Sequence, residues 1–113
     1  MHEYSIVQAL LERVEAEARA RGATAVHRLL VRIGELSGVE VELLTTAYDT
    51  FRARTICEHA ALEVQAVPAR WACGRCGGTI RRGDLLQCPR CAVPASLVEG
   101  GEIMLDRIEM EVP

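Results

Sequence analysis

The first three residues, Met1, His2 and Glu3, could together chelate a metal ion. The α-amine of Met1, the backbone nitrogen of His2 and the His2 imidazole could reach one ion, and they would close fused five- and six-membered chelate rings. Three nitrogens in one plane suit Ni(II) or Cu(II), which favour square-planar nitrogen and oxygen ligands. Glu3 adds a carboxylate beside them. The N-terminus is therefore a candidate nickel or copper site.

Four cysteines form a second candidate metal site. They stand in two C-x2-C pairs, Cys73/Cys76 and Cys88/Cys91, separated by 11 residues. Two such turns facing each other give the tetrahedral set of four thiolates that structural zinc prefers, and this set leaves no open position for a substrate. Structural zinc is the favoured interpretation, ahead of a rubredoxin-like iron site or two disulfides. We expect a hairpin around Arg82-Gly83-Asp84 between the pairs.

Composition bounds the remaining possibilities. The 113 residues suffice for one domain with a modest core, half of the residues are apolar, and the formal charge is −3. The sequence contains no apolar run long enough to span a bilayer and no signal-peptide pattern at its N-terminus. We therefore expect a cytoplasmic protein with reduced or metal-bound cysteines.

Periodicity predicts the elements that must position these residues. Residues 5–21 show helical spacing of apolar residues, with a capping box at Ser5 and Gln8 and a stop at Gly22. Residues 26–33 alternate as a half-buried strand. A second capping box at Ser37 and Glu40 predicts a helix that buries Leu44, Ala47, Tyr48 and Phe51 and ends near Arg54. Residues 61–67 and 103–112 alternate as two further strands.

These elements predict an α+β fold in which two helices pack on a small three-stranded sheet. Residues 1–69, completed by a C-terminal strand in 99–113, would form the domain that carries the N-terminal site. Residues 70–98 hold four of the five cysteines and few large apolar groups, so we expect an inserted zinc-knuckle subdomain that needs its metal to fold.

Other residues with possible chemistry have simpler interpretations. Cys57 and His59 could be a ligand pair, but a semi-buried thiol beside a surface imidazole is favoured, and His27 is expected on the surface. Glu40 could approach the N-terminus, although a helix-capping role is favoured.

Five arginines and a single acidic residue, Asp84, lie in residues 70–98. Since no aromatic residue lies in the knuckle loops to stack a base, we expect no nucleic-acid binding. No phosphate loop or nucleophile elbow indicates an enzyme.

In combination, several motifs of this chain resemble those of the HypA/HybF family of nickel-insertion proteins. They are Met1-His2-Glu3, Gly34-Glu35-Leu36-Ser37, the helix around Phe51, Ala61-Leu62-Glu63, the two cysteine pairs, and Gly100-Gly101-Glu102. The resemblance covers the whole chain. It implies a metallochaperone, not an enzyme, that delivers Ni(II) during maturation of [NiFe]-hydrogenase, and for some relatives urease.

The resemblance also implies site residues and partners. Nickel would bind at the N-terminus through Met1, His2 and Glu3, with Glu40 as a further candidate, and zinc would bind Cys73, Cys76, Cys88 and Cys91. The partners would be a HypB-type GTPase and the hydrogenase large subunit, with urease accessory proteins as a further possibility, and the chain would be a monomer or homodimer. Histidines that flank the second cysteine pair in some relatives are absent here, so a pH-sensing role is not expected. The alternative function is a zinc-ribbon adaptor that binds a protein or nucleic acid without nickel chemistry.

Overall fold

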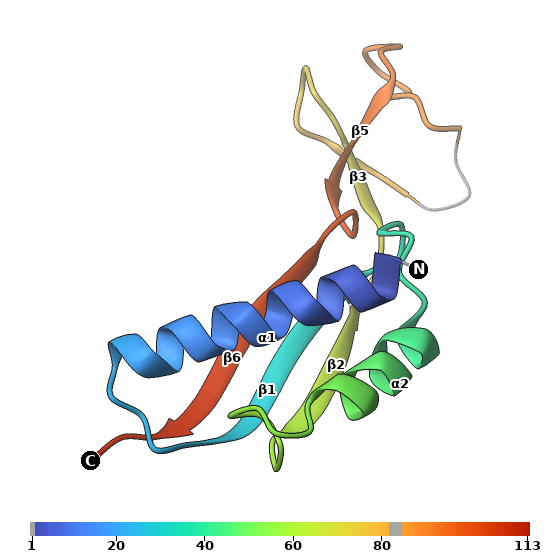
Figure 1. The fold of residues 1–113 in the computed structure, drawn as a ribbon. Coiled ribbons are helices and arrows are strands. Elements are labelled where there is room, and N and C mark those ends of the chain that lie inside the picture. The colour runs from blue at the N-terminus through green and yellow to red at the C-terminus, as the bar shows by residue number, and fades with distance from the viewer. Residues whose placement is uncertain (1, 82–84) are drawn as a thin grey trace.

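The computed structural model describes residues 2–81 and 85–113. The chain forms two helices and six strands in these ranges (Figure 1). They follow in the order α1 (His2–Ala20), β1 (Ala25–Gly34), α2 (Val41–Phe51), β2 (Ala61–Val67), β3 (Arg70–Cys73), β4 (Thr79–Ile80), β5 (Ala95–Glu99) and β6 (Ile103–Glu111).

The main sheet has the strand order β2-β1-β6, so the first strand of the chain lies in the centre. β1 runs parallel to β2, because α2 crosses over between them, and antiparallel to β6. The pairing of β1 with β6 is irregular between Leu30 and Val31, where Asp106 lies opposite neither residue. This sheet and the two helices confirm the predicted α+β fold class.

Both helices pack on the same face of the main sheet (Figure 1). The predicted stripe on α1 is confirmed, since Val7, Val14 and Ala18 are fully buried. Alternate residues of β1 complete this core, while Arg28 and Arg32 face the opposite side. Arg28 forms ion pairs with glutamates of β2 and β6, and Arg32 forms one with Glu99 of β5 in the second sheet. Phe51 was expected in the core, but it is exposed at the end of α2, where its ring contacts Tyr4 edge-on.

The predicted starts of both helices are wrong. α1 begins at His2, one turn before the capping box expected at Ser5, and α2 begins at Val41, with Glu40 as an N-cap residue whose side chain makes no capping bond. Ser37 accepts a hydrogen bond from the N–H of Val39 rather than from α2. The reason for the early start of α1 is tertiary, because His2 and Glu3 both bind the segment that precedes α2. Such contacts order a first turn that local sequence alone would leave frayed.

A second sheet, with the strand order β4-β3-β5, extends from one end of the main sheet. Its two connections to the main sheet, residues 68–69 and 100–102, meet the segment after β1. The N–H of Leu36 donates to the Gly100 carbonyl over 2.8 Å, and the N–H of Gly34 donates to the Glu102 carbonyl over 2.8 Å. A Cβ on Gly34 would lie 2.3 Å from the Gly100 backbone, so this close approach requires glycine. The motifs Gly34-Glu35-Leu36-Ser37 and Gly100-Gly101-Glu102, which are distant in sequence, thus form one junction between the two sheets.

The result is an elongated molecule with principal extents of 55, 30 and 17 Å. The start of α1 lies beside the junction of the two sheets, while the C-terminus lies at the opposite end of the main sheet (Figure 1). No helix in the described residues is long and apolar enough to cross a membrane. The described loops place the two candidate metal sites in different parts of the molecule.

Candidate metal centres

The four cysteines of the two pairs converge at the far end of the second sheet. Cys73 ends β3, and Cys88 and Cys91 lie in the turn before β5. Their four Sγ atoms all lie within 4.8 Å of one another, and the Sγ atoms of Cys76 and Cys88 are 3.8 Å apart. A tetrahedral zinc with bonds of about 2.3 Å to sulfur sets its ligands about 3.8 Å apart. The cluster therefore has the dimensions of a metal site.

Each cysteine pair lies on a turn with the same hydrogen bonds. The N–H of Cys73 donates to the Gly78 carbonyl and the N–H of Cys88 to the Val93 carbonyl, each over 2.9 Å. The residue four places after each first cysteine has a left-handed backbone: Gly77 has φ 73° and Ala92 has φ 55°. The site is therefore built from two copies of one local turn.

Backbone N–H groups of these turns stabilise thiolates. The Cys76 and Arg75 N–H groups donate to the Cys73 sulfur and keep the pKa of that thiol below its ordinary value. The Cys91 and Arg90 N–H groups lower the pKa of Cys88 to about 6. Burial, together with the neighbouring sulfurs, raises the pKa of Cys91 to about 12. Four thiols packed this closely cannot all ionise without a cation between them, because like charges repel.

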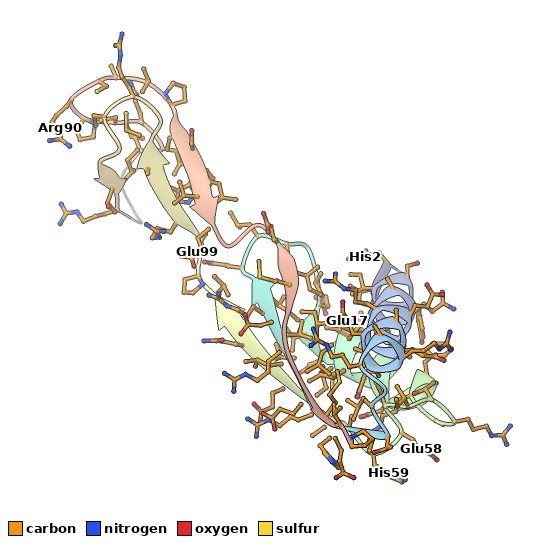
Figure 2. The ribbon with its side chains drawn as sticks, turned by 90° about the vertical axis from the view of Figure 1, so that its left-hand side faces the viewer. His2, Glu17, Glu58, His59, Arg90 and Glu99 are labelled. Carbon is orange, nitrogen blue, oxygen red and sulfur yellow. The ribbon has the colours of Figure 1, made fainter. Side chains whose placement is uncertain are left out.

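The donor set fits a structural metal and not a pair of disulfides. All five cysteines are free thiols, and a separation of 3.8 Å is far longer than the S–S bond of about 2.05 Å. Sulfur ligands in a tetrahedron suit zinc or iron. Arg90, at the tip of the molecule in Figure 2, lies with its guanidinium 3.8 Å from the Cys76 sulfur. The predicted hairpin at residues 82–84 falls outside the described residues.

His2 lies in the first turn of α1, at the end of the helix nearest the junction of the two sheets (Figure 2). Its side chain is 60% exposed. Its Nε2 atom lies 3.0 Å from the Gly38 carbonyl oxygen and 3.2 Å from Oε2 of Glu3. The imidazole is thus open to solvent yet held on one side by the segment that precedes α2.

Glu3 is the buried charged residue of this end of the molecule, with 5% of its surface exposed. Its Oε2 accepts a hydrogen bond from the Glu40 N–H over 3.3 Å. Its own backbone N–H and that of Glu40 hold the pKa of the Glu3 carboxyl below its ordinary value, with the His2 imidazole adding a smaller effect. A carboxylate in the first turn also compensates the positive end of the helix dipole.

Glu40 meets Glu3 through its backbone rather than its carboxylate, and its own side chain is exposed. The favoured prediction, a capping role for Glu40 at helix position N3, is wrong, because Glu40 is the N-cap residue and its side chain makes no capping bond. The alternative, an approach of Glu40 to the N-terminus, is made by its backbone N–H. Met1 lies outside the described residues. Among the four predicted nickel residues, the structure therefore places His2, Glu3 and Glu40 together.

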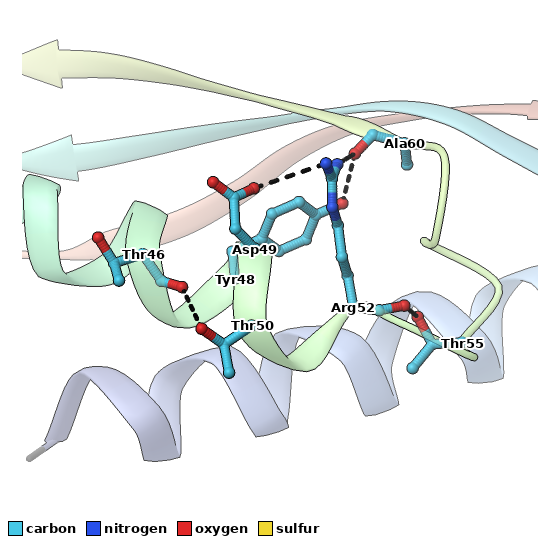
Figure 3. Close-up of polar contacts among 7 residues, drawn as sticks. All are labelled: Thr46, Tyr48, Asp49, Thr50, Arg52, Thr55 and Ala60. Carbon is cyan, nitrogen blue, oxygen red and sulfur yellow. Dashed lines mark hydrogen bonds and ion pairs between the residues drawn. The ribbon is translucent and has the colours of Figure 1, made fainter.

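Cys57 and His59 do not form a ligand pair. Cys57 is fully buried, and burial raises the pKa of its thiol, whereas His59 is exposed at the end of the molecule far from His2 (Figure 2). The neighbouring chain is fixed by the Ala60 carbonyl, which accepts hydrogen bonds from the Tyr48 hydroxyl over 2.7 Å and from Arg52 over 2.8 Å (Figure 3). The favoured interpretation was a semi-buried thiol beside a surface imidazole. The surface imidazole is confirmed, and the thiol is more deeply buried than expected. His27 is also exposed and pairs with Glu111 over 3.2 Å.

Sequence reasoning missed Gly38, whose carbonyl contacts the His2 ring. Gly38 contributes its backbone carbonyl oxygen. Every residue type has this group, so the residue type alone does not indicate the contact. The only sequence signal was the loop itself, since Gly34-Glu35-Leu36-Ser37-Gly38 breaks the preceding strand and ends next to Glu40.

The fold and the two centres define an α+β metal-binding protein. A family model described as "Hydrogenase/urease nickel incorporation, metallochaperone, hypA" matches residues 1–110. The chain is 40% identical to the hydrogenase maturation factor HypA of Wolinella succinogenes over 98% of this chain and 96% of the relative. It is 38% identical to the HypA of Aquifex aeolicus, covering 99% of both chains.

Two solved structures share the fold. The solution structure of the Ni metallochaperone HypA from Helicobacter pylori aligns with a TM-score of 0.76 and 28% identity over 98% of both chains. A second solution structure of a HypA protein aligns with a TM-score of 0.82 and 29% identity over 100% of this chain and 98% of that one. The chain therefore belongs to the HypA family of hydrogenase and urease nickel-incorporation metallochaperones.

Proposed function

We propose that this protein carries Ni(II) at its N-terminus and delivers it during maturation of [NiFe]-hydrogenase, with urease as a second candidate target, while zinc at the four cysteines has a structural role. The observation that supports the nickel site most is the position of His2. It lies in the first turn of α1 with an exposed imidazole, next to the buried Glu3 carboxylate.

The backbone nitrogen of His2 lies at the start of α1, where it is available to a metal. The first N–H groups of a helix have no carbonyl partner within the helix. When an ion binds this nitrogen, the amide proton can pass to solvent without breaking a helical hydrogen bond. With the α-amine of Met1 and the imidazole, the His2 amide provides three nitrogens in one plane, and Glu3 and Glu40 lie at the edge of this site.

The exposure of His2 suits a carrier. Affinity in nitrogen and oxygen sites rises from nickel to copper, so selectivity must come from geometry and delivery rather than from strength alone. A ring that is 60% exposed leaves room for a receiving protein to approach the ion. The four thiolates, in contrast, close their metal off from further ligands, and we infer that the chain is a carrier rather than an enzyme.

We further propose that residues 70–98 fold as a zinc-dependent unit, apart from a domain formed by residues 1–69 and 99–113. The described core of this unit contains Cys73, Ile80 and Cys88 as its buried residues, with four partly buried side chains against them. Such a small cluster cannot offset the entropy of ordering the chain, so a metal is needed.

The proposed partners follow from family membership. They are a HypB-type GTPase, the hydrogenase large subunit and, for urease, its accessory proteins. Two further predictions rest on the sequence: the chain is a monomer or a homodimer, and its location is cytoplasmic.

A nickel titration of the untagged protein tests the proposal. We expect wild type to bind nickel, the His2→Ala variant to lose this binding, and both to retain the same zinc content by metal analysis. His59→Ala is the matched control, because His59 is exposed at the far end of the molecule, and we expect it to bind as wild type does. Equal nickel stoichiometry in wild type and His2→Ala would contradict the proposal and favour a zinc-ribbon adaptor.

A further inference from the structure

Among the described residues, the polar contacts of the His2 ring are made by one of its two nitrogens. Nε2 lies 3.0 Å from the Gly38 carbonyl oxygen and 3.2 Å from Oε2 of Glu3. In the described residues, no hydrogen bond or ion pair involves Nδ1 of this ring. The two ring nitrogens therefore have different surroundings before any metal arrives.

These surroundings select one tautomer of the neutral ring. A neutral imidazole carries a hydrogen on one nitrogen and a lone pair on the other. A carbonyl oxygen and a carboxylate are both acceptors, so each is satisfied only by an N–H on Nε2. Nδ1 then keeps its lone pair.

The chelate at the N-terminus needs this same lone pair. Nδ1 is the ring nitrogen nearer the backbone, and only it closes a six-membered ring that shares the His2 amide nitrogen with the five-membered ring from the α-amine. A ring protonated on Nδ1 would first have to exchange its proton before it could bind. The hydrogen bonds at Nε2 thus prepare the nitrogen that the ion would use.

Glu3 is well placed for this role because it is itself fixed. Its side chain is 6% exposed, and its Oε2 accepts the Glu40 N–H over 3.3 Å while lying beside the His2 ring. A buried carboxylate held by a backbone donor cannot swing freely toward solvent. The observed pose directs it to Nε2 rather than to the nitrogen that faces the chelate.

We propose that Glu3 and the Gly38 carbonyl are positioning groups, which hold His2 as its Nε2–H tautomer and leave Nδ1 open for the ion. This inference rests on the proposed nickel site and changes the role of Glu3 within it: the carboxylate acts on the metal through His2 and is not itself a ligand. Partners that orient a metal-binding histidine in this way typically change metal affinity by about 10–100-fold when removed. Because Gly38 remains when Glu3 is replaced, we expect the lower end of that range.

The test combines a measurement without metal and one with it. Long-range ¹H–¹⁵N correlation spectra of the untagged, nickel-free protein report the tautomer of each histidine, at about pH 8, where an ordinary imidazole is neutral. Nickel titrations with absorption spectra then report the affinity and the geometry of the nickel site. The variants are Glu3→Ala, which removes the acceptor, and Glu3→Gln, which keeps an amide oxygen at the same place.

The matched control is the pair formed by His27 and Glu111. Their Nε2···Oε1 distance is also 3.2 Å, but both side chains are exposed, at 59% and 66%, and they lie on the sheet rather than at the N-terminus. Glu111→Ala removes a carboxylate from a histidine in the same way. We expect no change in nickel affinity and none in the tautomer of His2.

We expect the Nε2–H tautomer for His2 in wild type. Because the Gly38 carbonyl remains in Glu3→Ala, this variant should weaken that preference without abolishing it and should bind nickel about tenfold more weakly. Glu3→Gln should recover most of both. The absorption spectrum of bound nickel should be unchanged. An Nδ1–H tautomer in wild type would overturn the proposal, as would a Glu3→Ala variant that behaves as wild type does. Equal loss of nickel in both variants with an altered spectrum would make Glu3 a ligand and also overturn it. If wild type bound no nickel, the proposed function would fail, and the tautomer spectra would still decide whether Glu3 positions His2.

Discussion

The two candidate metal centres of this protein are built in opposite ways. The four cysteines come from one stretch of 19 residues, from Cys73 to Cys91, and N–H groups of the same turns stabilise the Cys73 and Cys88 sulfurs. The N-terminal site is assembled from distant segments, since His2 and Glu3 contact Gly38 and Glu40, 36 and 37 residues away. The cysteine site is thus built from residues close in sequence and has no open ligand position. The N-terminal site is built by tertiary contacts and is open to solvent.

Under the proposed function, this difference would separate a metal that holds the protein together from a metal that the protein carries. A closed set of four thiolates stabilises the fold around it and gives up its ion slowly. An exposed imidazole at a helix end can bind an ion and still offer it to another protein. The junction formed by Gly34, Leu36, Gly100 and Glu102 connects the two parts, so that the segment that touches His2 also joins the second sheet.

The largest expected effect is that of removing zinc. Chelation, or replacement of Cys88 by Ser, should leave residues 70–98 without a fixed structure while the main sheet stays folded. The reason is that the second sheet has a small core of its own, which we propose the metal completes. Two-dimensional ¹H–¹⁵N spectra before and after chelation check this. Retained, dispersed signals for residues 70–98 in fully zinc-free protein would remove the contrast between the two centres.

An N-terminal extension should affect only the other centre. Two residues added before Met1 convert its amine to an amide, so we expect nickel affinity to fall by more than the roughly 10–100-fold that loss of an orienting partner costs. Zinc content should not change. The control is the same two residues added after Pro113, since the C-terminus lies at the opposite end of the main sheet. Unchanged nickel coordination in the N-terminally extended protein would show that the amine is not a ligand.

The smallest effect concerns the two turns of the cysteine site. Gly77 and Ala92 occupy equivalent left-handed positions, and a Cβ on Gly77 would meet no atom within 4 Å. Gly77→Ala should therefore cost only the conformational penalty of about 1 kcal/mol, which weakens zinc binding about fivefold. Ala92→Gly should instead strengthen zinc binding. This effect should be smaller, because glycine also adds conformational freedom to the unfolded chain. Competitive zinc titrations measure both, and the same sign for both variants would contradict the equivalence of the two turns.

Local patterns predicted much of this molecule. The spacing of the cysteines predicted their convergence, and alternation predicted β2 with the bounds observed, Ala61–Val67. These features depend on residues close in sequence. The start of α1 could not be predicted in this way, because the turn at His2 is ordered by Gly38 and Glu40 and not by the side chain of Ser5.

The same reason explains the errors at Phe51 and Glu40. Helical spacing placed Phe51 on the buried face, but α2 ends there, and its ring meets Tyr4 at the surface instead. Glu40 was expected to cap α2 with its carboxylate, whereas its backbone N–H binds Glu3. Both outcomes depend on how α1 and α2 pack against each other, which no local pattern contains.

The most direct test of the contrast is to load one sample of untagged protein with both nickel and zinc and challenge it with an excess of EDTA. Metal analysis of the protein fraction over time follows the two ions together. We expect nickel to leave the exposed N-terminal site early while zinc stays with the four cysteines. Loss of both metals at the same rate, or retention of nickel after zinc has gone, would contradict the assignment of one open carrier site and one closed structural site.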